Sequence, residues 1–139
     1  MGKNTILIFG YGYTSIFLSS LLIKEGWVVF ATTRDVGNFP SIKKNGVQPI
    51  LFSDENEIEK TINKGVYVLN SIPPSEEGDP VLSQYSKLIL EKKNFINWVG
   101  YFSTTSIYGD RKGEWVTEST IPNPSLPRSI KRLRVENLW

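Results

Sequence analysis

The sequence of 139 residues contains no cysteine and no histidine. Without cysteine the chain forms no disulfide framework and performs no thiolate chemistry. Without histidine it lacks the commonest general base and the commonest metal ligand. Any proton transfer must therefore use other side chains, and we expect no metal site.

The chain also lacks long segments of one charge or of continuous hydrophobicity. It carries 16 basic and 14 acidic residues, a net charge of +2, which is too balanced to indicate binding to nucleic acid or to a membrane surface. Its apolar runs are too short to span a bilayer, and residues 1–4 leave no room for a leader peptide. With 40% hydrophobic residues, we expect one globular, cytoplasmic domain.

Short runs rich in Val, Ile and Phe alternate with helical or turn-rich segments. The runs predict strands at 5–9, 27–31, 47–52, 66–70 and 98–103. Helices are predicted between them, at 41–45, at 55–64 and from Asp79-Pro80 to about residue 93. Another helix precedes Gly26, and we expect it to bury a broad apolar face made by Ile16, Phe17, Leu18, Leu21, Leu22 and Ile23.

Strands without polar alternation are typical of a parallel sheet that is covered on both faces. The sequence therefore predicts an α/β fold, a three-layer sandwich. Right-handed crossovers favour the strand order 3-2-1-4-5, with a ligand over the carboxyl ends of the first and fourth strands. A flavodoxin-like strand order is the alternative.

The first predicted strand runs directly into Gly10-Tyr11-Gly12-Tyr13-Thr14-Ser15 and then into a helix. A strand, a glycine turn and a helix in this order predict a pyrophosphate site of the Rossmann type, because the helix N-terminus supplies free N–H groups and a positive dipole end. Gly10 permits the tight turn, Gly12 lets a phosphate approach the backbone, and small Ser15 allows close packing of helix on strand. The usual fingerprint has Gly or Ala in place of Ser15, and a purely structural turn is the other interpretation.

Hydroxyl residues follow the fifth predicted strand as Ser103-Thr104-Thr105-Ser106, before Ile107-Tyr108-Gly109. At this edge of the sheet they could bind a substrate oxygen, or they could satisfy backbone groups where the strand ends. After the fourth predicted strand stands Ser71-Ile72-Pro73-Pro74. Its two prolines end both helix and sheet, so a rigid loop is one interpretation of this segment.

Together these three segments resemble the extended or atypical short-chain dehydrogenase/reductase superfamily. More closely, the chain is similar to the NAD-dependent epimerase/dehydratase branch, which includes nucleotide-sugar epimerase-like proteins. The resemblance covers essentially all 139 residues. It implies a dinucleotide cofactor held by a set of candidate binding residues, namely Gly10, Tyr11, Gly12, Tyr13, Thr14, Ser71, Ile72, Pro73 and Ser103. Asp54 is similar in place to an acidic residue near adenine, and a helix cap is the alternative role.

The end of the second predicted strand bears on the choice of cofactor. It reads Thr32-Thr33-Arg34, where a site specific for NAD usually has a carboxylate that holds the ribose 2′-OH. Hydroxyls and a guanidinium suit a 2′-phosphate. We therefore expect NADP, with NAD as the second choice, and Asp35 is an alternative surface partner for Arg34.

The family's catalytic pattern is only partly present. The resemblance implies a Ser or Thr that fixes the substrate oxygen, a position that Thr104 matches, and a Tyr with a Lys four residues further on. In this sequence Arg128 and Arg132 stand at those two positions. Arginine stays protonated at neutral pH, so it cannot act as the base, although Arg132 could hold a ribose or an oxyanion. Tyr108 is the nearest other phenol, with packing as its alternative role.

The predicted function is that of an NADP-binding domain, residues 1–139, of an epimerase/dehydratase-like oxidoreductase acting on a nucleotide sugar or a related carbonyl compound. The alternative is a non-catalytic dinucleotide sensor or interaction module. The resemblance implies later strands and a substrate lobe that do not follow before Trp139. We therefore expect apolar surface, self-association into a homo-oligomer, and packing roles for Trp115 and Trp139.

Overall fold

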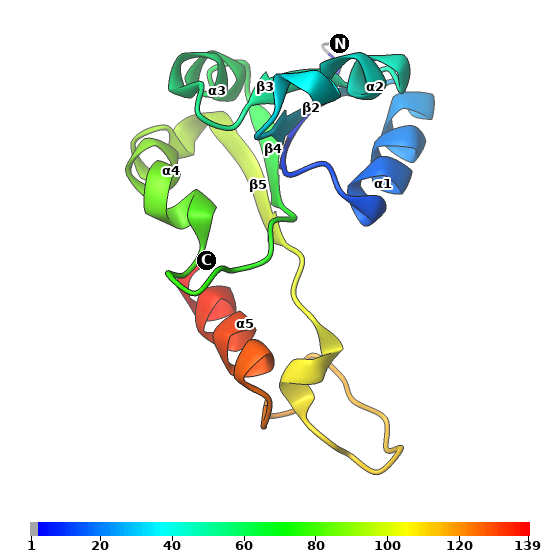
Figure 1. Cartoon of the computed structure of the whole chain (residues 1–139), viewed down its shortest axis with the longest axis vertical. Coiled ribbons are helices and arrows are strands. Elements are labelled where there is room, and N and C mark those ends of the chain that lie inside the picture. Colours follow the sequence, from blue (N-terminus) through cyan, green and yellow to red (C-terminus); the bar gives the residue numbers. More distant parts are fainter. Residues whose placement is uncertain (1–2) are drawn as a thin grey trace.

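A computed structural model describes residues 3–139, and its centre is a five-stranded sheet with the order β3-β2-β1-β4-β5 (Figure 1). All neighbouring strands in this sheet run parallel. The Rossmann-like strand order predicted from the sequence is thus confirmed, and the flavodoxin-like order is wrong. The strands are β1(Thr5–Phe9), β2(Val28–Thr33), β3(Gln48–Leu51), β4(Val66–Asn70) and β5(Ile96–Tyr101).

Helices cover both faces of the sheet, which gives the predicted three layers (Figure 1). One face carries α1(Tyr13–Lys24) and α2(Phe39–Lys44). The opposite face carries α3(Glu55–Ile62) and α4(Pro80–Glu91). Both α3 and α4 begin at an aspartate whose carboxylate accepts hydrogen bonds from backbone N–H groups of the first turn. Such caps fix the starting residue of each helix.

The alternation of side chains along the strands divides the core into two clusters. In β1, Leu7 and Phe9 face α3 and α4, whereas Ile6 and Ile8 face α1 and α2. All four side chains are almost inaccessible to solvent. A strand buried on both faces requires continuous hydrophobicity, which explains why this run was recognisable in the sequence.

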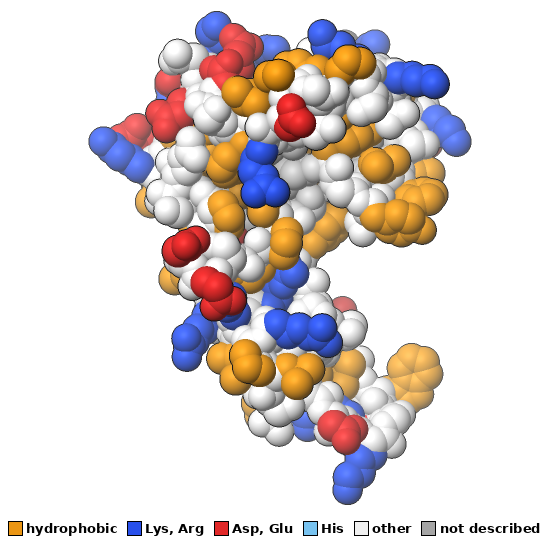
Figure 2. Space-filling view, viewed as in Figure 1, with side chains coloured by type: hydrophobic (Ala, Val, Ile, Leu, Met, Phe, Trp, Pro, Cys, Tyr) orange, Lys and Arg blue, Asp and Glu red, His pale blue; other side chains and the backbone are white. Residues whose placement is uncertain are grey.

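The apolar face predicted for α1 is only partly confirmed: Leu18, Leu22 and Ile23 pack against the core, whereas Ile16, Phe17 and Leu21 are exposed. The residues of α1 that are buried against the sheet are Ser15 and Ser19, while Phe17 and Leu21 are 58% and 60% exposed. Figure 2 shows hydrophobic side chains gathered on the outer surface over α1. Small side chains allow the helix to approach β1 closely, with Leu18, Leu22 and Ile23 packed beside them and the other large residues outside.

Strand β5 forms one edge of the sheet, since it pairs only with β4 among the described residues. It lies two residues earlier than predicted, and its Trp98 and Val99 are 49% and 41% exposed. Next to it an apolar groove of about 370 Å³ runs between α4 and β5. Leu82 and Ile89 of α4 border this groove and are only half-buried.

Residues 102–139 extend below the sheet and end with α5(Pro127–Leu138) (Figure 1). Before α5 a long connection includes Trp115, which is fully exposed, so the packing role predicted for Trp115 is wrong. Trp139 is half-buried against the core, as predicted. No helix among residues 3–139 is long and apolar enough to cross a membrane.

We predict that the protein loses stability between about pH 10 and pH 12 because of Tyr85. Burial, followed by the charges of Glu55 and Asp54, raises the pKa of Tyr85 from 10.0 to about 12. As the pH rises through this window the unfolded chain releases the phenolic proton first, so the free energy of unfolding falls. Urea titrations at several pH values should show this decline, with a weaker decline for Tyr85→Phe. An equal decline in both proteins would contradict the assignment.

Candidate functional site

The turn between β1 and α1 is built around Gly10. Gly10 has φ +91°, and a Cβ added there would lie 2.9 Å from Cγ1 of Ile72 and 3.0 Å from Oγ of Ser71. Its N–H donates to Oγ1 of Thr32 at 2.9 Å. Glycine is therefore required at this position both by the backbone conformation and by the close approach of the β4–α4 loop.

Gly12 stands at the N-cap of α1 and differs from Gly10. Its backbone is extended, with φ −92° and ψ −171°, and nothing lies within 4 Å of the position of an added Cβ. No side chain caps the helix, and its first turn holds no acidic residue. The first N–H groups of α1 are thus left for a partner from outside the helix, and the dipole at this end favours an anion.

Ser15 and Ser71 hold this turn against the β4–α4 loop. The hydroxyl of Ser15 donates to Oγ of Ser71 at 2.8 Å, and Ser71 donates to the carbonyl oxygen of Phe9 at 3.0 Å. Ser15 is 1% exposed. A small side chain at position 15 therefore allows the close packing of helix on strand that the sequence predicted.

A cavity of about 680 Å³ opens over the carboxyl ends of β1, β2 and β4. Its size suits a ligand of the size of a nucleotide. Gly10, Tyr11, Gly12, Arg34, Ser71, Ile72 and Pro73, seven of the predicted cofactor-binding residues, line it. The remaining lining residues are Ile16, Thr32, Thr33, Asn38, Ser41, Ile42, Asn45, Phe52, Ser75 and Pro80.

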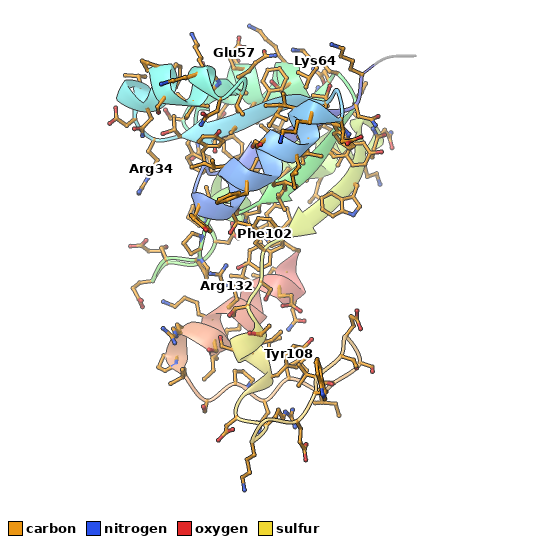
Figure 3. The ribbon with its side chains drawn as sticks, turned by 90° about the vertical axis from the view of Figure 1, so that its right-hand side faces the viewer. Arg34, Glu57, Lys64, Phe102, Tyr108 and Arg132 are labelled. Atoms are coloured by element: carbon orange, nitrogen blue, oxygen red, sulfur yellow. The ribbon has the colours of Figure 1, made fainter. Side chains whose placement is uncertain are left out.

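Within residues 3–139, Arg34 is the one charged residue that lines the cavity. It is exposed, and Figure 3 shows its side chain projecting away from the domain. Asp35 is turned toward the backbone, because its carboxylate accepts from the N–H of Gly37 at 2.8 Å. Among the described residues Arg34 forms no ion pair, so the predicted alternative pairing with Asp35 is wrong.

Sequence reasoning missed the contribution of the segment around α2 to the cavity. Asn38 donates to Oγ1 of Thr33 at 3.1 Å, and Asn45 donates to the hydroxyl of Tyr11 at 3.2 Å. Ser41 and Phe52 also line the cavity. Asn38 and Ser41 are separated by Phe39 and Pro40 and follow Val36 and Gly37, so no sequence pattern marked them as site residues.

Other predicted site residues do not line the cavity. Tyr13 is 79% exposed and its ring contacts Phe17, with centroids 4.9 Å apart. Thr14 is exposed on the first turn of α1. Asp54 accepts from the N–H of Glu57 at 3.1 Å as the N-cap of α3, which confirms the capping interpretation.

The hydroxyls that follow β5 also lie outside the cavity. Ser103 donates to the carboxylate of Glu136 on α5. Thr104 caps the 3₁₀ helix Thr105–Tyr108 by accepting from the N–H of Ser106 at 3.3 Å. The hydroxyl of Ser106 accepts in turn from Ser129 at 2.8 Å. These hydroxyls thus bind one another, the local backbone and α5.

Arg132 attaches α5 to the end of β5. Its guanidinium donates to the carbonyl oxygen of Phe102 at 2.8 Å and lies over the ring of Tyr101, whose hydroxyl it contacts at 3.3 Å (Figure 3). Burial raises the pKa of the Tyr101 hydroxyl, and Arg132 opposes part of that effect. Arg128 is exposed, and Tyr108 is half-buried below the sheet.

Residues 3–139 contain no group of three or more Asp and Glu side chains arranged to hold a metal ion. The residues that line the cavity supply backbone amides, hydroxyls, amides of Asn and one guanidinium. Such a set suits an anionic ligand that also offers hydroxyl groups.

Comparisons with known proteins identify the fold. No protein-family model matches the chain, and no curated protein matches it. A conserved protein of unknown function from Silicibacter pomeroyi is 36% identical, with a TM-score of 0.86, over 99% of this chain and 48% of its own.

Two solved epimerases share the fold at lower identity. UDP-glucose-4-epimerase from Stenotrophomonas maltophila, solved with NAD and a formylated UDP-arabinopyranose, has 19% identity and a TM-score of 0.69 over 99% of this chain and 47% of its own. UDP-N-acetylglucosamine 4-epimerase from Bacillus cereus has 19% identity and a TM-score of 0.71 over 98% of this chain and 53% of its own. The chain thus has a Rossmann-like fold and spans about half the length of these structures.

We predict that Gly10→Ala destabilises the fold by about 1–3 kcal/mol, because alanine must adopt φ +91° and displace Ile72 and Ser71. Gly12→Ala serves as the matched control, since its added methyl group meets no atom within 4 Å. It should cost less than about 1 kcal/mol, the loss of a favourable N-cap residue. Urea denaturation of both variants measures the difference, and equal losses would contradict the argument.

Proposed function

We propose that the cavity over β1 and β4 binds a dinucleotide, with its pyrophosphate at the N-terminus of α1. The observation that carries the proposal is the uncapped start of α1, where nothing occupies the space beside Gly12. Backbone N–H groups at such an end bind phosphate oxygens and the helix dipole favours their charge. In this proposal Gly10, Tyr11 and Gly12 line the pyrophosphate site, and Tyr13 and Thr14 contribute through the backbone of the first turn of α1.

The lining residues of the β4–α4 loop are assigned to one half of the dinucleotide. In this proposal Ser71, Ile72 and Pro73 border the adenosine and ribose region. Ser103 lies outside the cavity, so it becomes a further cofactor contact only when its hydroxyl leaves the carboxylate of Glu136. The NAD in the structure of the Stenotrophomonas maltophila epimerase supports a nicotinamide dinucleotide as the ligand class. When bound, such a cofactor supplies a hydride donor or acceptor, while this chain's residues bind and orient it.

We further propose that the preferred cofactor is NADP rather than NAD. Among the described residues, Arg34 is the one charged residue lining the cavity, which Thr32, Thr33 and Ser41 also line. No carboxylate lines the cavity to hold a ribose 2′-OH. A guanidinium among hydroxyls favours the additional charge of a 2′-phosphate.

The wider proposal is an NADP-binding domain of an epimerase/dehydratase-like oxidoreductase that acts on a nucleotide sugar or another carbonyl compound. The substrates in the names of the two epimerases support this class. In it Thr104 orients the substrate oxygen. Arg132 has no role as a base, because it stays protonated and already binds the carbonyl oxygen of Phe102.

A non-catalytic dinucleotide sensor is the second candidate. It is favoured because Ser103, Thr104 and Arg132 are all engaged in contacts within residues 101–136. Incubation of the protein with NADPH or NADP and a panel of UDP-sugars distinguishes the enzyme from the sensor. Epimerisation or carbonyl reduction supports the enzyme, whereas saturable nucleotide binding without turnover supports the sensor.

The first prediction from this proposal concerns Gly12→Ala, whose methyl group projects into the space proposed for the pyrophosphate. Dinucleotide affinity should fall by about ten- to a hundredfold, because charge-assisted hydrogen bonds to phosphate are lost while the fold is kept. NADPH fluorescence titrations measure the affinity, and circular dichroism checks the fold. Unchanged binding would contradict the pyrophosphate position.

The second prediction concerns Arg34→Ala. Affinity for NADPH should fall by about tenfold or more, whereas affinity for NADH should not change, because only NADPH carries the 2′-phosphate. Lys44→Ala is the matched control, an exposed cation on α2 that does not line the cavity. Isothermal titration calorimetry measures the affinity of each variant for both nucleotides. Equal losses of affinity for NADPH and NADH in Arg34→Ala would overturn the proposed preference for NADP.

A further inference from the structure

A buried carboxylate, that of Asp79, joins three parts of the chain. Asp79 is 5% exposed. Its Oδ1 accepts from the N–H groups of Val81 at 2.8 Å and Leu82 at 2.9 Å, at the start of α4. Its Oδ2 accepts from Nδ2 of Asn70 at 2.7 Å and from the indole N–H of Trp139 at 3.0 Å. The carboxylate therefore links the end of β4 and the first turn of α4 to the residue that follows α5.

Asn70 carries this connection toward the cavity. Its side chain is completely buried, and its Oδ1 accepts from the N–H of Ile72 at 2.9 Å. Because Asp79 only accepts hydrogen bonds, Asn70 must present its NH₂ group to Asp79 and its oxygen to Ile72. Ile72 and Ser71 are in turn the side chains closest to Gly10.

We propose that Trp139 is a positioning residue for the dinucleotide site, acting through Asp79 and Asn70 on the loop at Ile72. The indole N–H is the outermost donor of this hydrogen-bonded series, and it lies 60 residues from Asp79 in the sequence. Figure 1 shows the C-terminal end beside the loop between β4 and α4. The inference rests on the proposed function, because it assigns Trp139 to the same cavity.

Two other contacts keep Trp139 at this place. Lys131 on α5 forms an ion pair with Glu76 of the β4–α4 loop at 2.6 Å. The indole ring stacks on Tyr101, with centroids 6.4 Å apart and an interplanar angle of 15°. The hydrogen bond to Asp79 is therefore separable from the packing of the ring, since phenylalanine keeps a ring for stacking and has no N–H.

The test is Trp139→Phe, compared with Trp115→Phe, which alters a fully exposed tryptophan. In Trp139→Phe the dissociation constant for NADPH should rise about three- to tenfold, a size typical of residues that act on a site through others. The amide of Ile72 should shift in the NMR spectrum of the nucleotide-free protein and exchange faster with solvent. Trp115→Phe should leave both quantities unchanged.

A second variant isolates the path. Asn70→Ala removes the link between Asp79 and Ile72, so adding Trp139→Phe to it should weaken NADPH binding no further. Additive losses would overturn the proposed path. An unchanged dissociation constant in Trp139→Phe would overturn the positioning role.

NADPH titration of the unsubstituted protein distinguishes a failure of this inference from a failure of the proposed function. If the unsubstituted protein binds no dinucleotide, the proposed function fails, and a positioning role toward a dinucleotide site is overturned with it. If the unsubstituted protein binds NADPH, the proposed function stands. The inference about Trp139 is then overturned if Trp139→Phe changes neither the Ile72 amide nor the affinity for NADPH, or changes only one of them.

Discussion

The hydrogen bonds of Ser71 join the two loops between which the cavity opens. The chain leaves β1 toward one face of the sheet and leaves β4 toward the other, so the loops diverge at the carboxyl ends of these adjacent strands. Ser71 binds the carbonyl oxygen of Phe9 and the hydroxyl of Ser15, which ties both loops to the start of α1. A larger side chain at position 15 or 71 would separate α1 from the sheet and change the shape of the site.

The same constraint explains where sequence reasoning succeeded for the fold and where it failed. The strands of the interior were predictable because burial on both faces demands uninterrupted Val, Ile and Phe. The orientation of α1 was predictable only in part, because the helix places Ser15 and Ser19 at its closest contact with the sheet, where large apolar residues usually lie. Apolar residues are spread around most of α1, so the sequence did not show which side of the helix faces the sheet.

Prediction of the site divides in a similar way. The glycine turn and Arg34 were accessible to sequence reasoning because their positions follow from the ends of β1 and β2. The roles of Ser103 and Thr104 were not, because a hydroxyl after a strand serves a ligand and a local turn equally well. Their contacts with Glu136 and Ser106 depend on how α5 returns to the sheet, which is a tertiary property.

The open edge of the sheet has a consequence for handling the protein. Strand β5 contains neither lysine nor proline, the residues that discourage further strand pairing, and its outer backbone groups have no partner strand among residues 3–139. At high concentration this edge would template the addition of extended chains, beginning at the exposed indole of Trp98. Solubility of the isolated polypeptide is thus expected to be limited by edge-to-edge aggregation, which charged substitutions at the exposed positions of β5 would relieve.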